Sequence, residues 1–205
     1  MPGIYLAAED QLSIAVAEKL LLSIDPAFEI EQPFPLRGNQ ELKRRMAAFN
    51  NIARSTLPVL VLTDLDAHPC PSALVQAWRG KERFSPNLLF RIAVRETEAW
   101  LLADRESFSA YTGIPIDKIT QTPEDESDPK GELLRLIRRH CKNRELKAAL
   151  LPTPGAAAKV GLGYNDALCR YVRGHWSPQS AAALAPSLVR AQRRIGELAS
   201  RLRQA

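Results

Sequence analysis

The sequence predicts an α/β fold in which a mostly parallel sheet is flanked by helices and followed by a basic helical C-terminal part. Short apolar runs of strand length alternate along the chain with longer segments that show helical apolar spacing. A strand, helix, strand order favours parallel pairing with right-handed crossovers. Lys and Arg then accumulate after residue 128, in segments with a helical pattern. These observations place the sheet in the first half of the chain.

Four segments have the character of strands. The first is short and apolar, the second alternates and is ended by prolines, and the third stops abruptly on two acids. The fourth begins a longer segment that becomes helical near Glu96. They are residues 3–8, residues 28–34 with Pro33 and Pro35 as the terminating prolines, residues 57–66, and the start of residues 87–104.

Between and after these strands, apolar spacing and Pro or Gly boundaries predict helices. Pro71 suits the first turn of one of them. The predicted helices cover residues 10–24, a segment from Gly38 or Asn39 to about Arg54, residues 71–78, residues 130–151 and residues 184–203.

Composition excludes several classes of protein. The chain has 205 residues, 45% of them hydrophobic and 25% charged, which is typical of one globular core or of one domain with a small appended part. No apolar run approaches the ~18 residues of a membrane helix, and the N-terminus lacks a signal-peptide pattern, so we expect a cytoplasmic protein that does not bind membranes. Three separated cysteines without a CxxC pair argue against structural zinc and a disulfide framework, and we interpret His68 and Cys70 as part of a turn.

The net charge of +5 conceals two halves of opposite sign. Up to Asp128 there are 13 Lys and Arg against 19 Asp and Glu, which gives −6, and from Pro129 onward there are 15 against 4, which gives +11. This division predicts a carboxylate site beside a surface that binds a polyanion such as nucleic acid. The alternative to a binding surface is that these charges only keep the exposed faces of the helices solvated.

Acidic residues follow the predicted strands. Asp64 and Asp66 end the third strand, and in an extended segment residues i and i+2 point to the same side. Two neighbouring carboxylates repel each other unless a cation or a shared proton compensates, and Mg²⁺ typically takes one or two carboxylates. Glu9 follows the first strand in the same way, although an acid there also suits the start of a helix.

A glutamate after the first strand and a DxD after the third resemble the Toprim domain. More closely, "IYLAAED", "VLTDLD" and "RIAVRETEAWLLAD" are similar to the Toprim-like domain-of-unknown-function family 4276, which is related to OLD-family nucleases, over residues 3–105. The family usually has a glycine beside its glutamate, whereas Asp10 follows Glu9 here. The resemblance implies a Toprim-like Rossmannoid catalytic core at residues 1–112. Acidic, proline-bearing composition predicts a loop or lid at residues 113–129, and the basic helical segments predict a C-terminal extension packed on the core at residues 130–205.

The resemblance also implies Mg²⁺- or Mn²⁺-dependent phosphoryl transfer on DNA or RNA. Asp64 and Asp66 would hold the ion, Glu9 would be a ligand or general base, and Glu96 or Glu98 would help to hold a second ion. A partner ATPase and a role in phage defence follow by analogy with OLD-like relatives.

A lysine that stabilises transition-state charge is also expected from the resemblance. Lys159, in the glycine-bearing "PTPGAAAKVGLGYN", is one candidate and Lys130 is the other; each also fits a solvated surface position. The stretch lacks GK[ST] and is therefore no Walker A motif. The alternative function is a non-catalytic subunit that binds nucleic acid or a protein, whereas a haloacid-dehalogenase-type phosphatase is disfavoured because its DxD follows the first strand.

Overall fold

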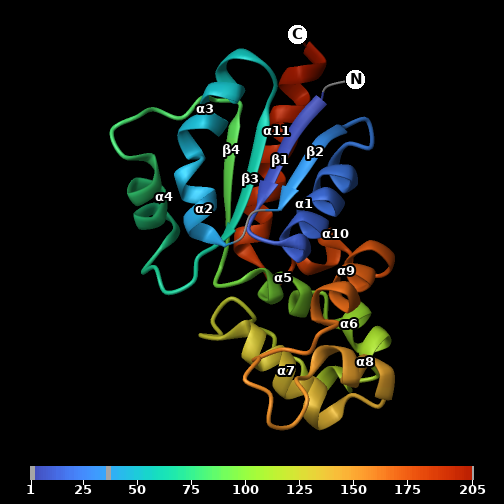
Figure 1. The fold of residues 1–205 in the computed structure, drawn as a ribbon. Coiled ribbons are helices and arrows are strands. Elements are labelled where there is room, and N and C mark those ends of the chain that lie inside the picture. Colours follow the sequence, from blue (N-terminus) through green and yellow to red (C-terminus); the bar gives the residue numbers. More distant parts are fainter. Residues whose placement is uncertain (1–2, 36–37, 205) are drawn as a thin grey trace.

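A four-stranded parallel sheet organises the part of the chain that this computed structural model describes, residues 3–35 and 38–204. Its strand order is β2-β1-β3-β4, and every neighbouring pair is parallel. The strands are β1 (Gly3–Ala8), β2 (Glu29–Pro35), β3 (Val59–Asp64) and β4 (Leu88–Ala93). The α/β prediction is confirmed, and the carboxyl ends of all four strands lie at the same end of the sheet (Figure 1).

Helices cover both faces of the sheet because successive strand side chains point to opposite sides. Leu60 and Leu62 belong to a large core with α1 (Gln11–Ile24) and α11 (Pro186–Gln204). Val59 and Val61 belong to a second core with α3 (Met46–Ser55) and α4 (Pro71–Arg79). Figure 1 shows α3 and α4 on one side of the sheet and α1 and α11 on the other.

The second half of the chain adds a group of helices beyond the carboxyl ends of the strands (Figure 1). They are α5 (Thr97–Ala103), α6 (Arg105–Thr112), the 3-10 helix η1 (Ile116–Lys118), α7 (Pro129–His140), α8 (Arg144–Leu150), α9 (Tyr164–Gly174) and α10 (Pro178–Ala181). Their apolar faces join the same large core as β1 and α1, and α11 then returns to contact β4. The helical C-terminal part therefore completes the core instead of lying apart from it.

Two predicted helices are each divided. A break at Arg45 separates α2 (Asn39–Arg44) from α3, and residues 141–143 separate α7 from α8, where Asn143 caps the new helix. Apolar spacing continues across both breaks, so periodicity alone did not reveal them. The sequence analysis also did not predict α6, α9 and α10.

Two strand ends differ from the prediction. β2 continues through Pro33 to Pro35, which an edge strand tolerates, and among the described strands β2 pairs only with β1. β3 ends at Asp64, and Asp66 has a left-handed φ of 51°. The prediction that Asp64 and Asp66 share one side of an extended segment is therefore wrong.

No helix in the described ranges is long and apolar enough to cross a membrane.

Candidate carboxylate site

Acidic side chains from three adjacent strands gather at the carboxyl end of the sheet. Glu9 follows β1, Asp64 is the last residue of β3, and Glu96 and Glu98 lie at the start of α5, directly after β4. Because β1, β3 and β4 are neighbours in the sheet, residues far apart in the sequence are brought to one place. This is where open parallel α/β sheets usually form ligand sites.

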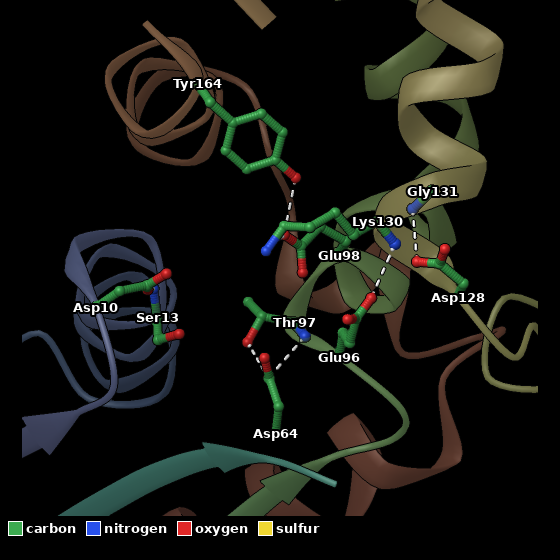
Figure 2. A network of polar contacts seen from close by, with 10 residues as sticks. All are labelled: Asp10, Ser13, Asp64, Glu96, Thr97, Glu98, Asp128, Lys130, Gly131 and Tyr164. Carbon is green, nitrogen blue, oxygen red and sulfur yellow. Dashed lines mark hydrogen bonds and ion pairs between the residues drawn. The ribbon is translucent and has the colours of Figure 1, made fainter. Parts of the chain in front are cut away.

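Asp64 is held by the first residue of α5. Its Oδ1 accepts hydrogen bonds from the Thr97 backbone N–H and the Thr97 hydroxyl, both at 2.8 Å (Figure 2). Burial, followed by the negative charges of Glu98 and Glu9, raises the pKa of Asp64 well above its ordinary value, although the bonds from Thr97 oppose the rise. Asp64 is thus fixed in position where its negative charge is poorly stabilised.

Glu9 lies against the end of β3. Its Oε1 accepts a hydrogen bond from the Asp64 backbone N–H at 3.0 Å and another from the Thr63 hydroxyl. Burial raises the pKa of Glu9, while these two hydrogen bonds reduce the rise. The neighbouring Asp10 instead caps α1 by accepting from the Ser13 N–H at 2.8 Å. The two successive acids therefore have different roles, and Glu9 is the one that faces β3.

Glu98 is the most enclosed acid of the site, with only 2% of its surface exposed. Its Oε1 accepts from the Tyr164 hydroxyl at 2.8 Å and lies 3.1 Å from the Lys130 ammonium (Figure 2). Burial alone would lower the pKa of Lys130, but Glu98, with smaller effects from Glu96 and Asp64, raises it overall. Burial and the charge of Glu98 also raise the pKa of Tyr164. Lys130 therefore supplies positive charge to the acids of the site.

Glu96 connects the site to the start of α7. Its Oε2 accepts the Lys130 backbone N–H at 2.9 Å, and Asp128 caps the same helix by accepting from the Gly131 N–H at 2.8 Å (Figure 2). Burial raises the pKa of Glu96, and the bond from Lys130 opposes the rise. The acidic segment before α7 thus positions Lys130 relative to the strand ends.

Asp66 lies at the edge of the site. It is exposed, and its Oδ2 accepts from the Asn39 amide at 2.8 Å. An open pocket beside it is lined by Asn39, Gln40, Lys43, Arg44, His68 and Trp78. His68 lies in a turn, where its N–H donates to the Leu65 carbonyl, as the sequence indicated. Asp66 therefore faces solvent and basic side chains, unlike Asp64.

Lys159 does not join the acids. It is exposed and forms no hydrogen bond or ion pair within the described part of the chain, whereas Lys130 contacts Glu98 directly. Gly161, near Lys159, serves packing, because a Cβ on it would lie 2.2 Å from the Ala149 carbonyl oxygen. Of the two candidate lysines, Lys130 is the one that the fold brings to the carboxylates.

The donor chemistry suits a hard divalent cation, since the acids offer only oxygen ligands. One oxygen of Asp64 accepts from Thr97, and the other accepts no hydrogen bond from any described residue. Residues 3–35 and 38–204 contain no group of three or more His, Cys, Asp or Glu side chains placed to hold a metal ion. Mg²⁺ commonly uses one or two carboxylates and keeps several waters, so Asp64 with one neighbouring acid would fit such an ion.

Comparisons of the chain with protein-family models, with curated proteins and with solved structures found no match.

Three residues of the site were not identified from the sequence. Thr63 and Thr97 orient Glu9 and Asp64, and Tyr164 donates to Glu98. Thr97 lies between two acids that were identified, which was an available signal. Tyr164 offered no such signal, because its helix was not predicted and its hydrogen bond to Glu98 spans 66 residues of sequence.

Proposed function

We propose that this protein catalyses Mg²⁺- or Mn²⁺-dependent phosphoryl transfer on nucleic acid, as a Toprim-like nuclease. The observation that carries the proposal is the convergence of Glu9, Asp64 and Glu98 on one end of a parallel sheet, where their mutual repulsion favours a bound cation. The resemblance to Toprim-like family 4276 supports the same reading. Convergence of acids by itself does not define a reaction, so the proposal needs a direct test.

Asp64 would hold the ion together with Asp66, which lies at the exposed edge of the site but whose charge acts on both Asp64 and Glu9. Glu9 would be a further ligand or general base, and Glu96 or Glu98 would lie beside a second ion. A bound divalent ion would orient the phosphate, offset its developing charge and activate water. Thr97 would keep Asp64 oriented, and Lys130 is better placed than Lys159 to stabilise negative charge. A partner ATPase and a role in phage defence remain part of this proposal by analogy.

A second candidate is a non-catalytic subunit that binds nucleic acid or a protein. The observation favouring it is that Lys130 already provides a positive charge 3.1 Å from Glu98, which partly offsets the repulsion without a metal. Such a subunit would fold and bind its partner normally after both Asp64 and Asp66 are replaced.

Calorimetric titration of Mg²⁺ and Mn²⁺ into the wild type and Asp64→Asn separates the two candidates. Asparagine keeps the acceptor for Thr97 but removes the charge, so we expect metal affinity to fall at least tenfold while the variant stays folded. Asp125→Asn is the matched control, because it removes one exposed negative charge elsewhere. Equal metal binding by the wild type and Asp64→Asn, or none by either even with nucleic acid present, would favour the non-catalytic subunit.

A further inference from the structure

A cluster of arginines lies along the edge of the sheet formed by β4. Among the described strands, β4 pairs only with β3, and α11 packs against it. Side chains alternate along a strand, so Arg91 lies on the same face as Leu89 and Ala93. Those two residues belong to the core that contains Ile195 of α11. Arg91 is therefore on the face of β4 that α11 covers.

The exposed face of α11 carries the rest of the cluster. Arg190, Arg193, Arg194 and Arg201 are spaced at i, i+3, i+4 and i+11, which places them on one side of a helix. Glu197, on the same side, lies near both Arg193 and Arg194. Glu124 is the other acid near this surface, close to Arg190. Positive charge thus exceeds negative charge along the helix.

One hydrogen-bond donor of Arg91 has no acceptor within the described residues. Its Nε is buried and makes no hydrogen bond. Burial, followed by the positive charge of Arg194, lowers the pKa of Arg91 to about 10, and Glu197 opposes this shift. A guanidinium that is buried among like charges is stabilised when an anion comes close to it.

The arginines run along β4, whose carboxyl end leads into Glu96 and Glu98 of the carboxylate site. Near the start of α11, the Ser187 hydroxyl accepts from the Val94 N–H at 3.3 Å, directly after β4. At the far end, Arg201 donates to the Pro86 carbonyl at 2.9 Å, just before β4. Eleven residues of helix span about 16 Å. This length suits an extended polyanion better than a single small anion.

We propose that Arg91, Arg190, Arg193, Arg194 and Arg201, here called the β4 arginine strip, bind the phosphodiester backbone of a nucleic acid that extends to the carboxylate site. Guanidinium groups pair with phosphate through two parallel hydrogen bonds, and such contacts carry no base specificity. The inference rests on the proposed function, because continuity with the carboxylates is what favours nucleic acid over an acidic protein.

Fluorescence anisotropy tests the strip with labelled single-stranded DNA, duplex DNA and RNA of one sequence, without divalent metal so that no probe is cleaved. The variant Arg190→Gln/Arg193→Gln changes two exposed side chains of α11. Each lost phosphate contact reduces the slope of log affinity against log salt by about 0.9 for duplex DNA and about 0.7 for single strands. We therefore expect a reduction of about 1.8 for the duplex and about 1.4 for each single-stranded probe that the wild type binds.

Arg138→Gln/Arg139→Gln is the matched control, since it removes two exposed arginines from α7. Equal slopes for the wild type and the strip variant would overturn the proposal. Failure of the wild type to bind any nucleic-acid probe would also overturn it, and arginine-dependent binding of a polyglutamate peptide would then identify a protein partner. The strip variant could lose probe binding while the wild type binds no metal ion. That result would support the arginine strip as a nucleic-acid site and reject only the metal-dependent chemistry.

Discussion

At the scale of single residues, Asp64 shows how the fold holds an unfavourable charge in place. Its carboxylate is fixed by the Thr97 N–H and hydroxyl, yet burial and the charges of Glu98 and Glu9 disfavour ionisation. Carboxyl groups with a raised pKa occur frequently at functional sites. In Asp64 the raised pKa accompanies a carboxylate held by two hydrogen bonds from Thr97. Asp64 is therefore the residue whose neutralisation is most informative.

Asp64→Asn should stabilise the protein at neutral pH. The folded state holds the Asp64 proton more tightly than the unfolded state does. Protonation of Asp64 therefore adds to the free energy of unfolding in full below its ordinary pKa of 3.8. This contribution is lost as the pH rises through the raised pKa of Asp64 in the folded state. Asparagine avoids this loss and still accepts from Thr97. We expect a gain of about 1 kcal/mol at pH 7, or about 2–4 °C in Tm, which disappears near pH 3.

Thermal melts at several pH values measure this effect. Asp66→Asn is the control, because Asp66 is exposed and its substitution should change stability by no more than about 0.5 kcal/mol. A Tm for Asp64→Asn that stays below the wild-type value from pH 3 to pH 8 would contradict the prediction.

At the scale of elements, a close backbone contact joins the segment before α9 to the end of α8. The Gly161 N–H donates to the Leu150 carbonyl at 2.9 Å, and a Cβ on Gly161 would lie 2.7 Å from the Leu151 carbonyl oxygen. The segment leads directly into α9, which begins with Tyr164. The glycine thus affects the placement of a hydrogen-bond donor to Glu98.

Gly161→Ala should destabilise the protein by about 1–3 kcal/mol, because the new methyl group forces the segment away from α8. Gly174→Ala is the matched control: it lies at the end of α9 with no atom within 4 Å of the added Cβ. Helix propensity predicts that this control is neutral or up to about 1 kcal/mol stabilising. Urea unfolding measures both, and equal stabilities for the two variants would refute the packing argument.

At the scale of the whole molecule, the large core depends on both halves of the chain. Leu6 and Leu60 from the sheet share that core with Leu133 of α7, Leu168 of α9 and Ile195 of α11. The opposite face of the sheet uses residues from the first half of the chain. The side of the sheet that faces the large core is thus covered by α1 and α11 together, and α7 and α9 extend the core beyond the strand ends.

A fragment of residues 1–112 should therefore not fold by itself. Removal of α11 would expose the apolar side of β4, and removal of α7 and α9 would expose the apolar sides of α5 and α1 to water. We expect the fragment to aggregate or to lack a cooperative thermal transition by circular dichroism, in contrast to the full chain under the same conditions. A monomeric fragment with cooperative unfolding would show instead that the first 112 residues form an independent domain.

The sequence by itself determined the sheet and most of its covering helices. Apolar runs such as residues 59–64 and amphipathic segments such as residues 11–24 carry their periodicity locally, so they could be recognised without tertiary contacts. The sequence also placed Glu9, Asp64, Glu96 and Glu98 at or after the ends of strands, because a strand end is a local feature of the sequence.

Only the tertiary structure decided which side chains meet. Lys130 and Tyr164 reach Glu98 from 32 and 66 residues away in the sequence, and Arg91 lies beside α11 because strand order places β4 at the edge. Asp66 does not continue the extended conformation of β3, because the chain is left-handed at this residue. Contacts of this kind depend on strand order, helix packing and turn geometry, which a periodic pattern does not encode.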